Sequence, residues 1–265
     1  MVLLGNSRWH WGELGAWDGA IGAGASDPLL PLQPPLEPPA LRCFHTSAAP
    51  QPLPIPPGRW RAWAAVGELP RGLDLPAERR LALDQVPLGA MPAWLGIDRA
   101  LVGWGAWSRQ GRLSPGTSIL VADAGTALSL TLVDGDGRFC GGRLSAGVAL
   151  QLRALAAGTA RLPQVAPAWW AAATPAAWPR DSSEAMVRGC LEAVAGGIAQ
   201  GWREARAAIS PAGARGDCRL WLTGGDGAPL ASLLAAQGVD FMAVPNLALE
   251  SLAALAVASQ PARLD

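Results

Sequence analysis

Lysine and tyrosine are both missing from this chain of 265 residues, so every basic side chain is one of its 21 arginines. The missing lysine excludes a lysine-dependent phosphate loop, a Schiff-base lysine and the catalytic lysine of protein kinases. Any positive charge that helps to hold a phosphate must therefore come from arginine or from a metal ion.

Charge is scarce as well. Charged residues make up 16% of the chain, against the usual quarter, and half of the residues are apolar. This composition predicts extensive burial, including a subunit interface. The formal net charge is zero, which offers no electrostatic reason to bind nucleic acid or an anionic membrane. We interpret the 13 tryptophans as core and interface residues, and not as a base-stacking platform.

The four cysteines have no Cys-x-x-Cys spacing, and only His10 and His45 accompany them, so we expect no zinc site. Buried thiols in a reducing cytosol account for them. The chain shows neither a charged-then-apolar leader nor an uncharged run of transmembrane length. We therefore expect a soluble cytoplasmic protein.

A glycine turn follows an apolar strand near the middle of the chain. Ile119 to Ala122 is typical of a buried strand, and Asp123-Ala124-Gly125-Thr126 comes next. Glycine lets the backbone approach a phosphate, successive N–H groups form an anion cradle, and the threonine hydroxyl adds a donor. Asp123 would repel a phosphate, so it implies a cation between the two. A plain hairpin with a polar corner fits these residues about equally well.

Two more glycine turns follow predicted strands. One is Leu3-Leu4-Gly5-Asn6-Ser7-Arg8 near the N-terminus, and the other is Thr223-Gly224-Gly225-Asp226. Three such turns spread along the chain favour a nucleotide clamped between two lobes. For Gly224 and Gly225 the alternative is a helix entry that holds no ligand.

Together these motifs resemble those of the type III pantothenate kinases, a family of the actin-like, sugar-kinase-like ATPase superfamily. The resemblance covers most of the chain and rests on Leu95-Gly96-Ile97-Asp98-Arg99, Asp123-Ala124-Gly125-Thr126-Ala127, Gly141 to Gly147, Thr159 to Pro163 and Thr223-Gly224-Gly225-Asp226. Two positions depart from the family pattern. Leu3 stands where the family usually has an aspartate near the phosphate and metal, and Met91 stands where it tends to have a tyrosine.

The resemblance implies an α/β fold of two RNase H-like lobes, as in actin-like ATPases, with a nucleotide cleft between them. The breaker Ser114-Pro115-Gly116 is a plausible boundary, which places the N-terminal lobe at 1–115 and the C-terminal lobe at 116–265. Eleven prolines between 28 and 57 exclude a regular helix there and predict an extended, partly polyproline surface segment.

The resemblance also implies a reaction, in which ATP with Mg²⁺ phosphorylates pantothenate to 4′-phosphopantothenate, on the way to coenzyme A. Asp98 would accept the proton of the attacking hydroxyl, and Arg99 would bind the substrate carboxylate. Asp123 would hold a monovalent cation, K⁺ or NH₄⁺. The implied substrate-binding residues are Gly96, Ile97, Asp98, Arg99 and Ser182. The implied ATP and phosphate residues are Leu3, Leu4, Gly5, Asn6, Ser7, Arg8, Gly125, Thr126, Thr223, Gly224 and Gly225. A homodimer would complete the substrate pocket.

Other interpretations stay open at this point. Asp98 and Arg99 also fit an ordinary ion pair at a helix start, and Ser182 also fits a plain helix cap. Because Leu3 removes one carboxylate, a catalytically impaired relative that binds nucleotide or pantothenate and regulates a partner is the alternative function.

The predicted elements are, in chain order, a hairpin over 1–22, strand 59–66, a short helix 76–83, helix 98–107, strands 118–123, 127–134 and 137–143, helix 147–157, a long helix from 182, strand 219–223, helix 228–237, strand 239–244 and helix 246–258. Asp181, with Glu184 three residues later, predicts the cap of the long helix. Its predicted apolar stripe is Met186, Cys190, Val194, Ile198 and Trp202.

Overall fold

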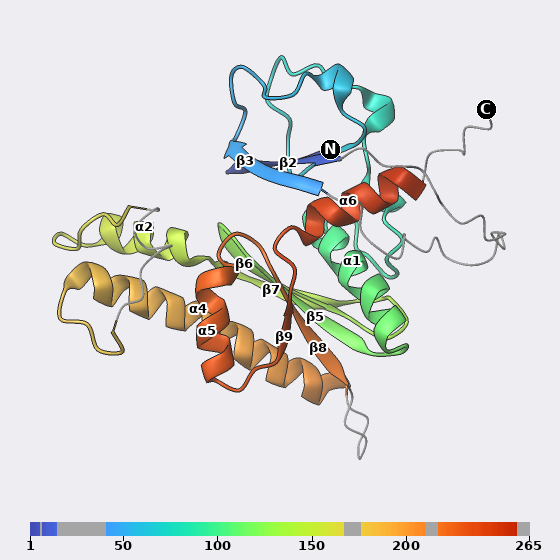
Figure 1. The fold of residues 1–265 in the computed structure, drawn as a ribbon. Helices are drawn as coiled ribbons and strands as arrows, with labels where there is room; N and C mark the ends of the chain where they lie inside the picture. Colours follow the sequence, from blue (N-terminus) through green and yellow to red (C-terminus); the bar gives the residue numbers. More distant parts are fainter. Residues whose placement is uncertain (6, 15–40, 167–175, 210–216, 259–265) are drawn as a thin grey trace. The chain divides into compact units, whose positions relative to one another are not determined.

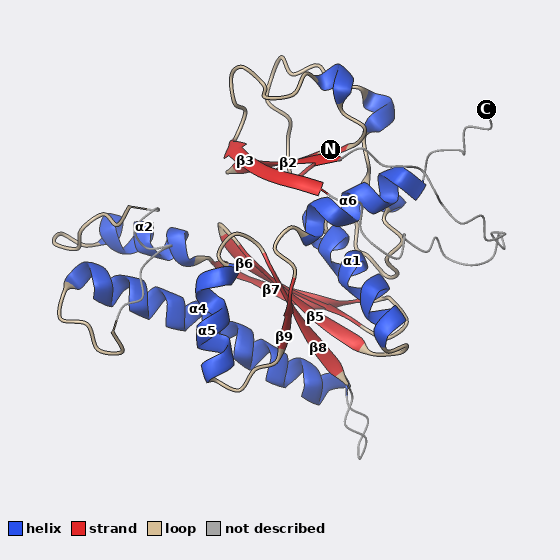
Figure 2. Ribbon diagram, in the orientation of Figure 1, coloured by secondary structure: helices blue, strands red, loops and turns tan. Residues whose placement is uncertain are grey.

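A computed structural model of the chain describes residues 1–5, 7–14, 41–166, 176–209 and 217–258. These residues form two compact units (Figures 1 and 2). Unit 1 contains Met1–Arg112 together with the segment from Asn246, and unit 2 is Leu113–Pro245.

Unit 1 is built on a four-stranded sheet in the order β3-β2-β1-β4. The strands are β1 (Val2–Leu4), β2 (Arg8–Leu14), β3 (Leu41–Ser47) and β4 (Trp63–Ala65). β1 is antiparallel to β2 and parallel to β4, and β3 lies at the edge, antiparallel to β2. Three short 3-10 helices lie at Pro57–Arg59, Ala77–Arg79 and Leu83–Gln85.

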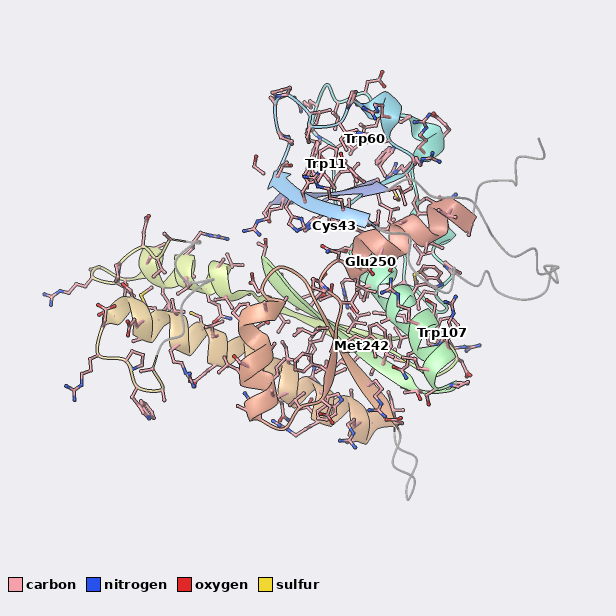
Figure 3. All side chains as sticks on the ribbon, viewed as in Figure 1. Trp11, Cys43, Trp60, Trp107, Met242 and Glu250 are labelled. Carbon is pink, nitrogen blue, oxygen red and sulfur yellow. The ribbon has the colours of Figure 1, made fainter. Side chains whose placement is uncertain are left out.

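Tryptophan fills one face of this sheet. The cluster on this face is buried and contains two residues of β1 and four tryptophans: Val2, Leu4, Trp9, Trp11, Trp60 and Trp63. The rings of Trp11 and Trp60, labelled in Figure 3, meet edge to face with centroids 5.4 Å apart. Each buried indole needs a hydrogen-bond partner. Trp60 Nε1 donates to the Ile55 carbonyl oxygen, and Trp63 Nε1 donates to that of Pro76. The interpretation of these tryptophans as core residues is confirmed for this cluster.

Two helices complete unit 1, α1 (Ile97–Leu113) and α6 (Leu247–Ala258). An added Cβ at Gly105 of α1 would lie 1.9 Å from Ser251 Oγ of α6, so the two helices cross in close contact. An ion pair between Arg109 and Glu250, with its charged atoms 2.8 Å apart, also joins them. On the sheet side, Gly12 of β2 lies next to Leu249. α6 therefore belongs with unit 1, whereas the sequence grouped 246–258 with the C-terminal lobe. The unit boundary at 112/113 lies three residues before the expected one.

Unit 2 is built on a five-stranded sheet in the order β7-β6-β5-β8-β9. The strands are β5 (Ser118–Ala124), β6 (Ala127–Val133), β7 (Phe139–Ala146), β8 (Cys218–Thr223) and β9 (Phe241–Ala243). β5 is the central strand. Its neighbour on one side is the antiparallel strand β6, and its neighbour on the other side is the parallel strand β8.

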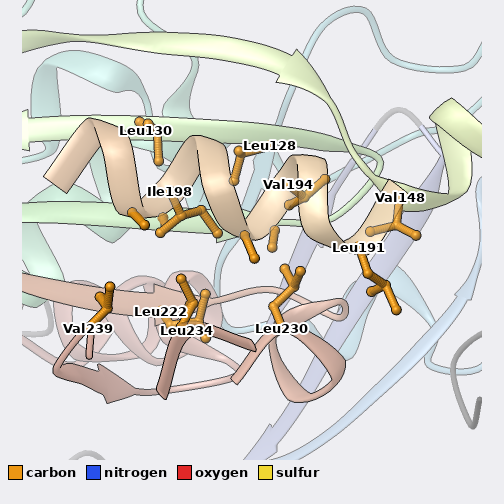
Figure 4. Packing of buried hydrophobic residues seen from close by; sticks show 14 of the residues in the cluster. Leu128, Leu130, Val148, Leu191, Val194, Ile198, Leu222, Leu230, Leu234 and Val239 are labelled. Carbon is orange, nitrogen blue, oxygen red and sulfur yellow. The ribbon is translucent and has the colours of Figure 1, made fainter. Parts of the chain in front are cut away.

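One face of this sheet carries α2 (Val148–Gly158), α4 (Ser182–Ile209) and α5 (Gly227–Ala236). The predicted apolar stripe of α4 is buried in the structure at Met186, Cys190, Val194 and Ile198. Figure 4 shows Val194 and Ile198 facing the strand residues Leu128 and Leu130. Spacing by four residues keeps these side chains on one helix face, which explains why the sequence pattern identified the contact surface.

The two units repeat one topology. In each, a central strand pairs antiparallel with the next strand of a hairpin, the third strand follows at the edge, and a parallel strand joins the other side. This repeat is the α/β arrangement of two RNase H-like lobes, so the expected fold class is confirmed. The repeat is absent from the amino-acid pattern and exists only at the level of strand order.

The stretch 28–57 was expected to be an extended, partly polyproline surface segment. Within it, Leu41–Ser47 is extended as strand β3 and pairs with all seven residues of β2. These seven residues contain no proline, so they can donate to the ladder, and Phe44 stacks on Trp11 at 6.0 Å. The predicted hairpin over 1–22 and the proline-rich stretch 28–57 both include residues between 15 and 40, which lie outside the described residues.

No helix among the described residues is long and apolar enough to cross a membrane.

The crossing of α1 and α6 leads to a stability prediction. We expect Gly105→Ala to lower the free energy of unfolding by about 1–3 kcal/mol, because the new methyl group would overlap Ser251 and push α6 away. Gly111→Ala is the matched control, since it lies in the same helix with nothing within 4 Å of an added Cβ. It should leave stability unchanged or raise it by about 0.5–1 kcal/mol. Equilibrium denaturation measures both, and equal effects would contradict the close crossing.

Candidate active site

The residues proposed for the second phosphate motif lie where central strand β5 ends. Asp123 is half-buried and pairs across the parallel ladder with Thr223 of β8. Gly125 and Thr126 form the tight turn into β6, and Thr126 is exposed. The carboxyl ends of the parallel strands β5 and β8 meet at the same edge, which is where ligands bind in open α/β sheets.

The start of α2 closes onto this turn. Gly147, the residue before α2, donates its N–H to the carbonyl oxygen of Thr126 at 3.0 Å. A Cβ at Gly147 would lie 1.9 Å from the carbonyl oxygen of Gly125, so no side chain fits between the two segments. Gly147 was noted only as the end of a family-like element, and its role in this packing could be found only from the structure.

The loop after β8 closes onto the same turn. Gly224 has φ +91°, a conformation that favours glycine, and an added Cβ would lie 2.3 Å from the Ala124 carbonyl oxygen. The same Cβ would lie 2.6 Å from Oδ1 of Asp123. Asp226 donates its backbone N–H to the Ala124 carbonyl oxygen at 2.9 Å and occupies the N-cap position of α5, with no side-chain capping hydrogen bond. Hydrogen bonds to the Pro245 carbonyl oxygen from Thr223 Oγ1 and the Gly224 N–H hold the outer side of the loop.

Three segments from separate parts of the sequence therefore converge at the end of β5. They are the Asp123–Thr126 turn, Gly147 with the start of α2, and the Thr223–Asp226 loop with the start of α5. Helix N-termini carry unpaired N–H groups and a partial positive charge, which suits a phosphate. The structure brings together the predicted residues Asp123, Gly125, Thr126, Thr223, Gly224 and Gly225. It adds Gly147 and Asp226, which sequence reasoning did not assign to the site.

This edge offers limited metal ligation. Among the described residues, no three His, Cys, Asp or Glu side chains gather into a cluster that could hold a metal ion. Mg²⁺ is nevertheless commonly held by one or two carboxylates together with water and the phosphates of the bound nucleotide. Asp123 is the carboxylate at the end of β5 that is available to hold a cation.

In unit 1 the predicted first phosphate turn joins β1 and β2. Gly5 donates its N–H to the Arg8 carbonyl oxygen at 3.1 Å, and a Cβ at Gly5 would lie 2.7 Å from that oxygen. Ser7 and Arg8 are exposed, whereas the side chains of Leu3 and Leu4 are buried. Only the backbone of those two leucines could therefore serve a ligand. Asn6 lies outside the described residues.

The predicted catalytic aspartate begins α1. Oδ1 of Asp98 accepts the backbone N–H of Arg99 at 2.9 Å, and the Gly96 carbonyl oxygen accepts the helical bond from Ala100. A Cβ at Gly96 would lie 2.4 Å from Asp98 Oδ1. Glycine at this position therefore leaves the carboxylate room to fold back over the helix start.

Arg99 is 8% exposed. Burial lowers the pKa of its guanidinium, and the adjacent Asp98 acts in the opposite direction. An arginine nonetheless keeps its proton at neutral pH, so Arg99 provides a fixed positive charge next to the carboxylate. Ile97, between Gly96 and Asp98, is buried.

Ser182 is exposed at the first turn of α4. The cap of this helix is Asp181, whose Oδ1 accepts the N–H groups of Ser183 at 2.8 Å and Glu184 at 3.1 Å. The predicted role of Asp181 as the cap is confirmed, so the cap interpretation of Ser182 loses its support. The substrate-binding role of Ser182 stays a prediction.

Two RNase H-like lobes with glycine-rich turns at their strand ends define a two-lobed protein of the actin-like ATPase class. The family model for type III pantothenate kinases matches residues 81–204. Curated relatives extend the match to nearly the whole chain. The chain belongs to the type III pantothenate kinase family, and it is a kinase.

Two relatives illustrate this similarity. A type III pantothenate kinase of Synechococcus elongatus is 30% identical over 97% of this chain and 96% of its own length. One from Synechococcus sp. (strain JA-3-3Ab) is 37% identical over 72% of this chain and 73% of its own. Among solved structures, the activator of 2-hydroxyisocaproyl-CoA dehydratase from Clostridium difficile is 10% identical over 97% of this chain and 92% of its own, with a TM-score of 0.44. The family assignment depends on the sequence relatives alone.

The close approach at Gly224 can be separated from its unusual backbone angle. An alanine in the left-handed conformation costs about 1–2 kcal/mol. We expect Gly224→Ala to destabilise the protein by more than this, because its methyl group also overlaps Ala124 and Asp123. Gly238→Ala is the matched control, with φ +68° and nothing within 4 Å. Equilibrium denaturation of the two variants gives the comparison, and a cost no larger at Gly224 would argue against the packed loop.

Proposed function

We propose that this chain transfers the γ-phosphoryl group of ATP to the primary alcohol of pantothenate, which gives 4′-phosphopantothenate for coenzyme A biosynthesis. The observation that carries this proposal is the convergence of the Asp123–Thr126 turn, Gly147 and the Thr223–Asp226 loop at the end of β5, in a chain of this family. Such a cradle suits the phosphates of a nucleotide, and the Gly-x-Asp-Arg motif provides a base and a cation.

The nucleotide would be held mainly by backbone groups. Gly125 and Thr126 would contact the phosphates through N–H groups and the threonine hydroxyl, and Gly224 and Gly225 would let the chain pass close to the adenosine. In unit 1, the turn of Gly5, Asn6 and Ser7 would add a second phosphate contact, with the Leu3 and Leu4 backbone behind it and the exposed Arg8 guanidinium beside it.

Asp98 would act as the general base. The hydroxyl oxygen of the substrate forms a bond to the γ-phosphorus, the bond to the bridging oxygen breaks, ADP leaves, and the hydroxyl proton passes to Asp98. The Arg99 N–H holds Oδ1, so we assign this proton to Oδ2. Phosphoryl transfer depends mainly on positioning and charge neutralisation, so one base with cations is sufficient.

The carboxylate of the substrate would pair with the Arg99 guanidinium, whose planar donors match a carboxylate. Gly96 and Ile97 would line this end of α1, and Ser182 would offer a hydroxyl from the start of α4. Bound Mg²⁺ would neutralise phosphate charge, and Asp123 would hold a monovalent cation, K⁺ or NH₄⁺, near the phosphates.

The chain would work as a homodimer in the cytoplasm. Leu150 and Leu155 of α2 are exposed apolar side chains, which supports a subunit contact on that helix. All four cysteines are free thiols, including the exposed Cys140, which supports a reducing compartment.

Asp98→Asn tests the base. We expect its kcat for pantothenate phosphorylation to fall by about 10²–10⁴-fold, because the amide accepts no proton, while ATP and pantothenate still bind. Gly96→Ala should also lower kcat, because its methyl group would displace Oδ1 of Asp98. The assay is transfer of labelled phosphate to pantothenate by the purified chain with Mg²⁺ and K⁺.

Asp84→Asn, on an exposed 3-10 helix of the same unit, is the matched control and should keep full activity. Equal turnover by Asp98→Asn and the unaltered chain would remove Asp98 as the base. If the unaltered chain binds ATP or pantothenate without turnover, the binding and regulatory alternative replaces the kinase.

Asp123→Asn tests the cation. We expect the unaltered chain to turn over faster in K⁺ than in Na⁺ at equal ionic strength, and the variant to lose most of this difference, because its amide carries no charge to hold the ion. Equal activity of the unaltered chain in both salts would refute a potassium site. The Asp134→Asn variant, changed at the β6–β7 turn, controls for a general loss of negative charge and should keep the K⁺ response.

A further inference from the structure

The only two histidines of the chain lie opposite each other in unit 1. His10 of β2 and His45 of β3 are register partners in the antiparallel ladder, so both side chains stand on the same sheet face. Their ring centroids are 4.7 Å apart with an interplanar angle of 75°. His45 is exposed and His10 is half-buried, so the pair is open to solvent on one side.

The surroundings of both rings favour the neutral imidazole at pH 7. Burial, the His45 ring and the Arg8 guanidinium, in decreasing order, lower the pKa of His10 to about 4. Burial and then Arg8 lower the pKa of His45 as well. Neutral imidazole is the form that ligates metal ions, because one ring nitrogen keeps a free lone pair.

The pair continues a row of side chains across the sheet. On the side of His10 away from β3, its register partner is Leu3 of β1. Leu3 in turn is the register partner of Ala64 of β4. Leu3 and Ala64 offer no ligand atom, so the two imidazoles are the ligating groups of this row. A Cβ at Gly5 would lie 3.9 Å from Cδ2 of His10, which places the pair beside the first glycine turn.

We propose that His10 and His45 together bind one divalent transition-metal ion. An ion about 2.1 Å from an imidazole nitrogen lies roughly 3 Å from the ring centre, so rings with centroids 4.7 Å apart can both reach it. Water or an anion completes the coordination. Imidazole ligands favour Co²⁺, Ni²⁺, Cu²⁺ and Zn²⁺, whereas Mg²⁺ prefers oxygen.

This site differs from the zinc site that the cysteine spacing argued against. The described residues contain no cluster of three or more His, Cys, Asp or Glu metal ligands, so a closed structural centre is not the proposal. Cys43 is another residue near the pair that could bind a metal, because it lies two residues before His45 on β3. Figure 3 labels Cys43 and Glu250 of α6; burial and then Glu250 raise the pKa of the Cys43 thiol. Two neutral imidazoles make a reversible, two-ligand site.

The charge of Arg8 distinguishes a cation site from an anion site. Its guanidinium acts on both histidines and would repel a metal ion. Replacing it with a neutral side chain should therefore strengthen metal binding. If the histidines and Arg8 instead bind a phosphate, the same replacement would weaken ligand binding.

The experiment is a Co²⁺ titration of the purified full chain without nucleotide or phosphate, followed by visible absorption, with Ni²⁺ binding measured by equilibrium dialysis. We expect one ion per chain and an affinity about tenfold or more weaker in His45→Ala. His45 is exposed on an edge strand, so this variant should fold as the unaltered chain does. Arg8→Gln should bind the ion more tightly, and Cys43→Ser should bind as the unaltered chain does.

Three outcomes would overturn the proposal. They are no ion bound by the unaltered chain, an unchanged affinity in His45→Ala, and weaker binding in Arg8→Gln. A Co²⁺ spectrum with a thiolate charge-transfer band that disappears in Cys43→Ser would assign the ion to the cysteine instead. None of these readouts depends on kinase activity, so failure of the metal site and failure of the proposed function are distinguishable.

Discussion

The arrangement of the candidate site depends on the carbonyl groups of Ala124 and Gly125 at the end of β5. Two other segments approach these groups so closely that a side chain of any size would collide with them, at Gly147 and at Gly224. Protein interiors are packed near their maximal density, and here the packing partners are backbone atoms. The start of α2 and the start of α5 are therefore held at one edge of the sheet, with Asp123 between them.

The same strand order supports different cores in the two units. Unit 1 fills one sheet face with tryptophan and covers the other with α6, whereas unit 2 packs α2, α4 and α5 over aliphatic strand residues. Strand order depends on backbone hydrogen bonding and chain handedness, so it tolerates either set of side chains. This tolerance explains how the two lobes share a topology without sharing a sequence pattern. The histidine pair stands on the face opposite the tryptophans, which is the face that α6 covers.

Much of the secondary structure could be predicted, because it depends on local patterns. The apolar stripe of α4, the strand runs of β5 and β6 and the breaker after α1 each have a signature within a few residues. β3 was missed because prolines on both sides concealed seven residues that could pair. The sequence did not predict that α6 belongs to unit 1. That membership depends on contacts of α6 with Gly105 and Arg109 of α1, a helix about 140 residues earlier in the chain. The family motifs predicted roles for Asp98, Asp123 and Thr126, but not the closeness of Gly147 to Gly125.

The sequence by itself determined most of the elements, the glycine turns after the strands, the family and the residue types available for phosphate chemistry without lysine. Only the tertiary structure decided which turns meet and that His10 and His45 face each other. The physical reason is range. Propensity, capping and hydrophobic periodicity act over a few neighbouring residues, whereas the meeting of residues 124, 147 and 224 depends on strand pairing between distant segments.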